Sequence, residues 1–224
     1  MGWLRLRPGS VILSMDILDI HTHSSKSNPS QHIFSCLPSA FSPLEGGYYS
    51  VGIHPWNINA GVKSEFEYLK EISSHPQIIA IGEAGLDKMI PVELSFQEEV
   101  FGWQIKLSEE LGKPLIIHSV KTSNEIIQLK KKYNPKSPWI FHGFRGKKEL
   151  AEQLIAHDIY LSFGEKYQES AMTSIPLDHL LLETDESNKT ITEIFEAAAK
   201  SLSLPVEQLI TQVQQNISRL FFNQ

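Results

Sequence analysis

Short apolar runs in this chain repeatedly end in a side chain that can bind a divalent metal ion. Runs of aliphatic, often β-branched residues are typical of strands that are buried on both faces, as in a parallel sheet. Parallel strands that end in His, Glu or Asp place these side chains on one rim, and in an α/β barrel this rim carries the chemistry. The sequence therefore predicts a metal site. The candidate ligands are His21, His23, Glu83, His118, His142 and Asp185.

The spacing of these residues predicts which of them would bind the same metal ion. His21 and His23 are two residues apart, so a regular strand directs both side chains to the same face, here toward the barrel axis. Glu83 is the candidate bridging ligand, because a carboxylate can give one oxygen to each of two ions. His118 and His142 follow neighbouring predicted strands and are the candidates for a second ion.

Asp185 follows the last predicted strand and returns beside His21 and His23 if the sheet closes. Glu83 and Asp185 are the predicted catalytic carboxylates. Four imidazoles and two carboxylates suit Zn²⁺, Mn²⁺, Co²⁺, Ni²⁺ or Fe²⁺ better than Ca²⁺. Mg²⁺ is unusual with so many imidazoles, although it can act from solution on a phosphate substrate. We expect one or two divalent ions per chain, and two ions can activate water and stabilise a leaving oxygen.

Further rim residues are candidates for substrate binding. His54 ends another apolar run and is either a ligand or a hydrogen-bond partner of the substrate. Trp56 could stack on a base or sugar, or pack its own loop. Lys121 and Arg145 each lie just past a strand-end histidine, where they could bind phosphate. Glu183 could point into the site or make a hydrogen bond within the strand.

Charge and composition narrow the class of protein. The net charge of −6 argues against coating nucleic acid through bulk charge, but residues 121–148 carry a local balance of +7 that could steer a phosphate-bearing substrate. Cys36 is the only cysteine, so a reducing compartment is expected. No apolar stretch approaches the roughly 20 residues of a membrane span. We predict a cytoplasmic protein with one domain at residues 15–224, in which residues 1–14 are either a frayed extension or the product of a misassigned start.

Strands alternate with helices from residue 49 onward, which predicts parallel pairing in an α/β barrel. Earlier connections are too short or too rich in Pro and Gly for crossover helices, so the first two are predicted to be absent or reduced. The fold class is therefore a single TIM-like (βα)8 barrel. Predicted strands span residues 16–21, 32–36, 49–54, 78–83, 115–118, 139–142, 159–163 and 180–184. Predicted helices span residues 64–74, 92–111, 122–132, 147–157, 191–202 and 206–222, with Ser64 as the expected N-cap of the first.

The missing helices leave apolar side chains of the early segments, such as Phe34 and Phe41, without their usual cover. We expect the loops at residues 24–48 and the C-terminal helix to cover them, and therefore a monomer. Cover by a partner subunit is the alternative.

The ordered motifs resemble the TatD family of metal-dependent hydrolases. The likeness covers most of residues 16–222. The matching segments are Asp19-Ile20-His21-Thr22-His23, Gly52-Ile53-His54-Pro55, Ile81-Gly82-Glu83-Ala84-Gly85-Leu86-Asp87, Gln97 to Phe101 with Gln104, Leu111 to Ser119, His142-Gly143-Phe144-Arg145-Gly146, Pro176-Leu177-Asp178, Leu181 to Asp185, and Asn216 to Phe221.

This resemblance implies a (βα)8-type barrel with a mononuclear or binuclear metal site that hydrolyses phosphodiester bonds, typically in DNA. It assigns as ligands the same six residues that the strand ends indicate. Single-stranded DNA is the expected substrate. The chain departs from the family pattern on the rim, and the departures leave the ligands intact but bear on the substrate. They are Lys88-Met89, Val120-Lys121, Gly143, Arg145, Glu186-Ser187 and a shorter early region.

Two other functions remain open from the sequence. The same ligands would serve a metal-dependent ester or amide hydrolase, because a Lewis acid polarises a carbonyl as well as a phosphoryl group. A metal-holding binding or regulatory module is the non-enzymatic alternative, and the altered rim residues are its motivation.

Overall fold

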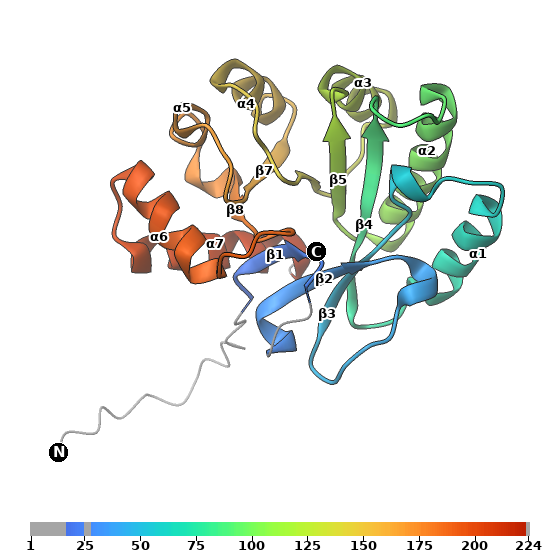
Figure 1. The fold of residues 1–224 in the computed structure, drawn as a ribbon, viewed down its shortest axis with the longest axis horizontal. Helices are drawn as coiled ribbons and strands as arrows, with labels where there is room; N and C mark the ends of the chain where they lie inside the picture. The colour runs from blue at the N-terminus through green and yellow to red at the C-terminus, as the bar shows by residue number, and fades with distance from the viewer. Residues whose placement is uncertain (1–16, 25–27, 223–224) are drawn as a thin grey trace.

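A computed structural model describes residues 17–24 and 28–222, so the predicted extension at residues 1–14 lies outside the described part. Eight parallel strands form one sheet in the order β1 to β8 (Figure 1). Their bounds are Asp19–Thr22 (β1), His32–Cys36 (β2), Tyr48–Val51 (β3), Ile78–Asp87 (β4), Leu115–Val120 (β5), Trp139–Phe141 (β6), Ile159–Phe163 (β7) and Leu180–Leu182 (β8). The predicted TIM-like barrel is confirmed.

The last strand segment returns to the first and closes the barrel. Thr22 and Asp185 form a parallel bridge, and the Asp185 N–H donates to the carbonyl of His21 at 2.9 Å. The His23 N–H in turn donates to the carbonyl of Asp185 at 3.4 Å. Closure therefore takes place at the residues that were predicted as ligands.

Helices follow the later strands and are reduced after the early ones, as predicted. Figure 1 shows the blue strands β1 to β3 joined by short turns, while the helices surround the rest of the sheet. The short 3-10 turns are Pro29–Gln31 (η1), Pro38–Ala40 (η2), Pro55–Asn57 (η3) and Leu177–His179 (η4). The α-helices are Val62–Ile72 (α1), Leu94–Leu111 (α2), Ser123–Tyr133 (α3), Lys148–Ile155 (α4), Glu169–Met172 (α5), Ile191–Leu202 (α6) and Val206–Phe221 (α7).

Local chemistry explains several helix ends and corrects some predictions. Helix α2 stops where Gly112 adopts a left-handed φ of 63°, which costs glycine little. Helix α6 starts with a capping box, in which Thr190 and Glu193 exchange hydrogen bonds. The predicted N-cap at Ser64 is wrong, because α1 already begins at Val62 after Gly61. The single-turn helix α5 was not predicted, since four residues carry too little periodicity.

Aromatic side chains from the loop after β2 and from the end of α7 pack against strand β3. The Phe41 ring, next to η2, packs edge-to-face on Tyr49 of β3 at 5.3 Å between centroids. The Phe222 ring, at the end of α7, packs in the same way on Tyr48 at 5.5 Å. Leu44 stays 55% exposed. These contacts are the ones expected for cover by the loop and the C-terminal helix.

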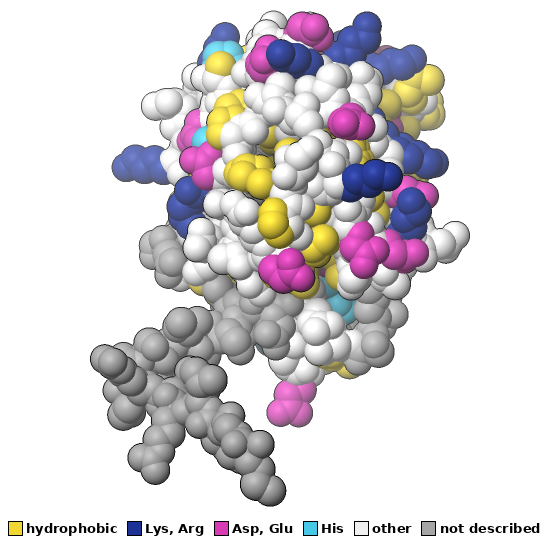
Figure 2. Space-filling model, turned by 90° about the vertical axis from the view of Figure 1, so that its left-hand side faces the viewer, with side chains coloured by type: hydrophobic (Ala, Val, Ile, Leu, Met, Phe, Trp, Pro, Cys, Tyr) yellow, Lys and Arg dark blue, Asp and Glu magenta, His cyan; other side chains and the backbone are white. Residues whose placement is uncertain are grey.

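The surface carries charges of both signs. Figure 2 shows the left-hand face of Figure 1, where Lys and Arg side chains alternate with Asp and Glu around a strip of apolar side chains. This face therefore presents no continuous positive patch. Among the described residues, no helix is long and apolar enough to cross a membrane.

Candidate metal centre

Glu83 lies at the middle of the site, on the long buried strand β4. Its side chain is 6% exposed, and its two carboxylate oxygens face different sets of imidazoles. Oxygen Oε2 lies 3.3 Å from His21 Nε2 and 3.1 Å from His23 Nε2. Asp185 Oδ1 lies 3.8 and 3.9 Å from the same two nitrogens. We call His21, His23 and Asp185 the Oε2 group.

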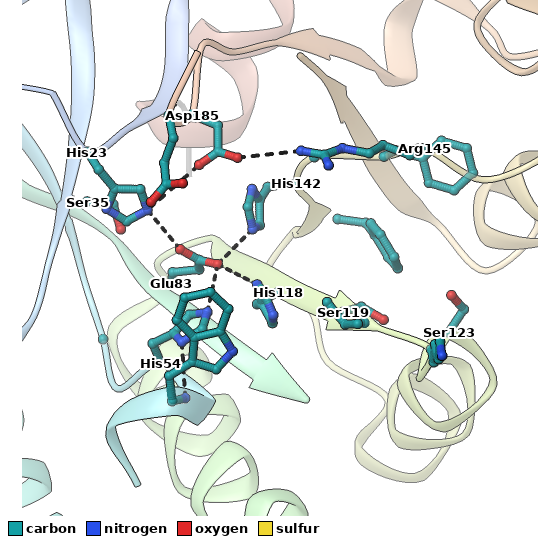
Figure 3. Close-up of a pocket in the computed structure, with 18 of the residues that line it drawn as sticks. His23, Ser35, His54, Glu83, His118, Ser119, Ser123, His142, Arg145 and Asp185 are labelled. Carbon is teal, nitrogen blue, oxygen red and sulfur yellow. Dashed lines mark hydrogen bonds and ion pairs between the residues drawn. The ribbon is translucent and has the colours of Figure 1, made fainter. Parts of the chain in front are cut away.

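Oxygen Oε1 of Glu83 faces the second set. It lies 2.7 Å from His118 Nδ1, 2.8 Å from His142 Nε2 and 3.2 Å from His54 Nε2 (Figure 3). We call His54, His118 and His142 the Oε1 group. The structure thus brings all six predicted ligands together and adds His54 to them. The two-sided contacts of Glu83 match those expected of a bridging carboxylate.

The elements place these side chains somewhat differently from the prediction. Strand β3 ends at Val51, so His54 does not end a strand but caps the turn η3, where its Nδ1 accepts the Trp56 N–H at 3.1 Å. His142 directly follows β6, and Asp185 follows β8 after two intervening residues. Strand β3 stops early because a side chain binds the backbone of Ile53, whose N–H donates to Gln104 Oε1 at 2.7 Å and whose carbonyl accepts from Gln104 Nε2 at 3.0 Å.

Backbone conformation at the rim is unusual in two places. Lys121 has a φ of 57° and Asp185 a φ of 52°, both in the left-handed region that non-glycine residues seldom adopt. Such conformations cluster at functional sites, where the surrounding structure holds them. Here the bridge to Thr22 fixes the backbone of Asp185.

The electrostatics of the centre couple Glu83 to its imidazoles. Burial raises the pKa of Glu83, but the charge of His142 and hydrogen bonds with His118 and His142 outweigh burial and hold it well below the ordinary value. Burial likewise lowers the pKa of His142, yet the carboxylates of Glu83 and Glu183 raise it well above the ordinary value. The two carboxylates thus favour the cationic form of the His142 imidazole.

The donor set fits a divalent ion better than it fits a closed hydrogen-bond network. Five imidazoles face one carboxylate, which offers about four acceptor positions. In the described part of the chain, neither ring nitrogen of the buried His21 has a hydrogen-bond partner, nor has His118 Nε2. Imidazole nitrogens and carboxylate oxygens are the ligands of zinc and similar ions. Three ligand groups have donor atoms within 4.8 Å of one another, namely His21 with His142 and Asp185, His21 with His23 and Glu83, and His54 with Glu83 and His118.

Two further carboxylates lie behind these imidazoles. Glu183 is fully buried, and its Oε1 lies 3.3 Å from His142 Nδ1 while it accepts the Gly143 N–H at 2.8 Å. Asp87 Oδ2 lies 3.6 Å from His118 Nε2 and accepts the indole N–H of Trp56 at 2.7 Å. The sequence left the role of Glu183 open and gave none to Asp87, although Asp87 belongs to the Gly-Leu-Asp motif.

A cavity of about 650 Å³ opens beside the centre, and the predicted substrate-binding residues line it. His54, Trp56, Lys121 and Arg145 all contribute to its wall. The Arg145 guanidinium reaches to 4.0 Å from Asp185 Oδ2 (Figure 3), whereas Lys121 forms no ion pair with any described residue. Trp56 is 66% exposed even though its indole N–H is bound.

A TIM-like barrel with a His, Glu and Asp cluster at the carboxyl ends of its strands has the architecture of a metal-dependent barrel hydrolase. Comparison with known proteins defines the family. Residues 41–222 match the model of the family described as TatD related DNase, and the chain belongs to this family of metal-dependent hydrolases.

Two similar proteins are each named as an uncharacterized metal-dependent hydrolase. The chain is 28% identical to the uncharacterized metal-dependent hydrolase YabD of Bacillus subtilis, over 78% of this chain and 77% of that protein. It is also 28% identical to the uncharacterized metal-dependent hydrolase YcfH of Escherichia coli K12, over 77% and 73% of the two chains. The crystal structure of the TatD homologue YJJV of E. coli K12 superposes with a TM-score of 0.80 at 19% identity, covering 92% and 98% of the two chains. This last likeness shows the fold.

Proposed function

We propose that this chain is a metal-dependent phosphodiesterase that cleaves single-stranded DNA. The observation that carries the proposal is the six-ligand cluster around Glu83, which lies beside an open cavity that has two cations on its wall. The matching family model bears the name DNase, which supports the same substrate class. The proposed ligands are His21, His23, Glu83, His118, His142 and Asp185, for one or two ions of Zn²⁺, Mn²⁺, Mg²⁺, Ni²⁺ or Fe²⁺.

A bound divalent ion would supply Lewis-acid polarisation of a phosphoryl oxygen and activation of a water molecule. The chain's own residues then have separable tasks. Glu83 would hold the two halves of the centre together, since each of its oxygens faces a different group of imidazoles. Asp185, on the cavity side, would accept the proton of the attacking water on a carboxylate oxygen.

The cavity wall would bind the rest of the substrate. Arg145 and Lys121 would pair with phosphate oxygens next to the scissile bond, because both cations line the cavity that adjoins Asp185. Trp56 presents an exposed indole face whose edge is anchored on Asp87, and a base could stack on it. Nucleic acid would therefore be a substrate bound through local contacts rather than through a broad positive surface.

The experiment is a nuclease assay on single-stranded DNA with Mn²⁺ or Mg²⁺, for the wild type and for Asp185→Asn. We expect nucleotide release by the wild type and a loss of about 10²- to 10⁴-fold in the variant, which is the usual contribution of a general base. Equal release by both proteins would contradict the proposal, since the activity would then come from a contaminant.

Ester or amide hydrolysis is the alternative that the same centre permits. The structure of a β-aspartyl dipeptidase from Fervidobacterium islandicum-AW-1 superposes on the chain with a TM-score of 0.57 at 10% identity, so related barrels include a protein named as a peptidase. A panel of phosphodiester, carboxylic ester and amide substrates, assayed on one preparation, distinguishes the two. Turnover of an amide without any phosphodiester turnover would favour the alternative.

A further inference from the structure

Two loops at the rim of the barrel expose large apolar side chains. Trp56 of η3 is 66% exposed, and Met89, which follows β4, is 62% exposed. Among the described residues, only Leu44 and Tyr68 join them as exposed large apolar side chains. Apolar side chains scattered singly over a surface need no explanation, but Trp56 and Met89 are held by the same group.

The group that holds them is the carboxylate of Asp87, which is buried at the end of β4. Its Oδ2 accepts the indole N–H of Trp56 at 2.7 Å, and its Oδ1 accepts the backbone N–H of Met89 at 2.7 Å. The ring of His54 packs at right angles to the indole, with 4.9 Å between centroids. One carboxylate therefore joins the two loops, and the indole is fixed by its edge while much of the ring stays exposed.

The loop after Asp87 is fixed at both of its ends by Gln97 of α2. The Gln97 side chain is 1% exposed, and its Oε1 accepts the backbone N–H of Asp87 at 2.8 Å. Its Nε2 donates to the carbonyl of Asp87 at 3.0 Å and to that of Val92 at 2.7 Å. A loop held in this way loses little freedom when a ligand binds, so the side chain that it carries is preorganised.

An exposed indole next to a thioether suits a flat, polarisable ring. Nucleobases stack on aromatic side chains with little regard to sequence, because every base has a π-face. The thioether of methionine makes favourable contacts with aromatic rings and adapts to their shape. A base inside a duplex is stacked on both sides and must leave the stack to reach such a pair of side chains.

We propose that Trp56 and Met89 form a clamp for one unpaired nucleobase at the mouth of the cavity. Trp56 stacks on one face of the base, Met89 contacts the base from the neighbouring loop, and Asp87 is the positioning residue for both. The phosphate attached to this base enters the cavity beside His54. The inference rests on the proposed function, for which it names the part of the substrate that is recognised.

The test compares two ligands that differ only in the base. One is the 5′-monophosphate of 2-aminopurine 2′-deoxyriboside, whose fluorescence falls when the base stacks, and the other is 2-deoxyribose 5-phosphate. Neither has a phosphodiester bond, so both can be titrated calorimetrically into the full-length protein with excess Mg²⁺. We expect the wild type to bind the nucleotide about 5- to 150-fold more tightly, which is the usual value of one stacked base. Equal affinity for the two ligands would overturn the proposal.

Variants assign the preference to the clamp. Trp56→Ala should weaken nucleotide binding by about 5- to 150-fold, and Met89→Ala by about 2- to 10-fold, while binding of the sugar phosphate is unchanged. Tyr68→Ala, which removes an exposed aromatic ring of α1 outside the cavity wall, is the matched control and should change neither affinity. A loss of the preference in Tyr68→Ala as large as in Trp56→Ala would contradict the assignment.

The positioning role of Asp87 needs a readout that a general structural role would not move. Asp87→Asn keeps the shape of the side chain but leaves one accepting oxygen for two N–H groups, so the ratio of the two affinities should fall by about 2- to 10-fold. Asp87 also lies 3.6 Å from His118 Nε2, and an effect through that imidazole would change both ligands alike and leave the ratio intact. A variant that melts like the wild type and keeps the full ratio would refute this role.

A cleavage assay separates this inference from the proposed function. The substrates are single-stranded DNA and a strand of equal length built from abasic tetrahydrofuran residues. We expect kcat/KM to be at least about 5-fold lower on the abasic strand. Equal kcat/KM on the two strands would overturn the clamp and leave the phosphodiesterase intact. Base-dependent binding of the 2-aminopurine nucleotide without cleavage of either strand would refute the phosphodiesterase and support the clamp.

Discussion

The first three strands and the last five build one barrel with different amounts of helical cover. Strands β1 to β3 are connected by short 3-10 turns, and the aromatic rings of Phe41 and Phe222 pack against β3. The later strands alternate with α-helices, whose buried side chains include Phe195 of α6.

Both regions nevertheless supply the centre. His21 and His23 come from the poorly covered part, while Glu83, His118 and His142 come from the helical part. Ligand positions depend on where strands end and how they are staggered, and the outer helices supply burial of the outer face. A barrel can therefore lose crossover helices without losing its metal site, as long as another apolar group covers the strands.

The largest effect is expected from the loss of a metal ligand. Variants of this kind test whether the early and the later strands are equally necessary for activity. Loss of a residue that only hydrogen-bonds a metal ligand already lowers metal affinity or activity by about 10- to 100-fold. Loss of a ligand itself, from either region, should therefore lower kcat/KM by at least about 100-fold. The variants are His21→Ala and His142→Ala, measured on single-stranded DNA. His157→Ala, at the end of α4 and away from the cluster, serves as the control. Normal activity of His21→Ala would mean that the early strands act only as scaffold.

Loss of an aromatic side chain should destabilise the protein more in the helical region than in the loop that packs on the early strands. Phe195 of α6 is 1% exposed. Its replacement by Ala should cost about 3–5 kcal/mol of unfolding free energy, because it leaves a cavity in the core. Phe41 is only partly buried, so Phe41→Ala should cost about 1 kcal/mol. Urea unfolding of the two variants measures the difference. Equal losses would show that the aromatic cover carries as much of the stability as the helices do.

A smaller effect, on the unfolding free energy and dependent on pH, is expected from a carboxylate of the helical region. Glu109 of α2 accepts the backbone N–H groups of Lys136 and Ser137 at 2.9 and 2.6 Å and so holds the segment that enters β6. Partial burial raises its pKa, but these hydrogen bonds outweigh burial and lower it below the ordinary 4.5. A lowered folded-state pKa contributes stability above the unfolded value, and this contribution is lost as the pH falls through the folded-state value.

We therefore expect Glu109→Gln to cost about 1 kcal/mol of unfolding free energy at pH 7 and progressively less below pH 4.5. Urea unfolding at pH 7, 5 and 3.5 measures this trend. Glu110→Gln, which alters the exposed neighbouring residue, is the matched control. A loss that grows toward low pH would contradict the assigned sign.

The smallest expected effect is on the alkylation rate of the cysteine thiol in the early strands. Burial raises the pKa of Cys36 from 9.0 to about 11, although the residue lines the cavity. Because the thiolate is the nucleophile, alkylation near neutral pH should be about 100-fold slower than for an ordinary exposed thiol. Iodoacetamide labelling followed by mass spectrometry, with glutathione as the reference, measures the rate. Labelling as fast as that of glutathione would mean that the cover of β2 opens readily.

Several features could be predicted from the sequence because they are local. A parallel strand buried on both faces needs a continuous apolar run, so each of the eight predicted strands overlaps an observed one, and the reduced early helices follow from connections that are too short. Strand β4 runs four residues beyond its predicted end at Glu83, to Asp87. Strand β3 was predicted three residues too long, since Val51-Gly52-Ile53 has the composition of a strand, while in the structure the side-chain amide of Gln104 binds the backbone N–H and carbonyl of Ile53. The candidate ligands are likewise local signals, because each one follows an apolar run.

The sequence by itself determined which strands form, which side chains end them and the chemistry that such residue types perform. Only the tertiary structure decided how these side chains meet. The two oxygens of Glu83 are divided between five imidazoles from four segments, Glu183 lies next to His142 and Asp87 next to His118, and Arg145 faces Asp185. The physical reason is that these contacts join residues far apart in the chain, and the stagger and closure of the barrel set their distances.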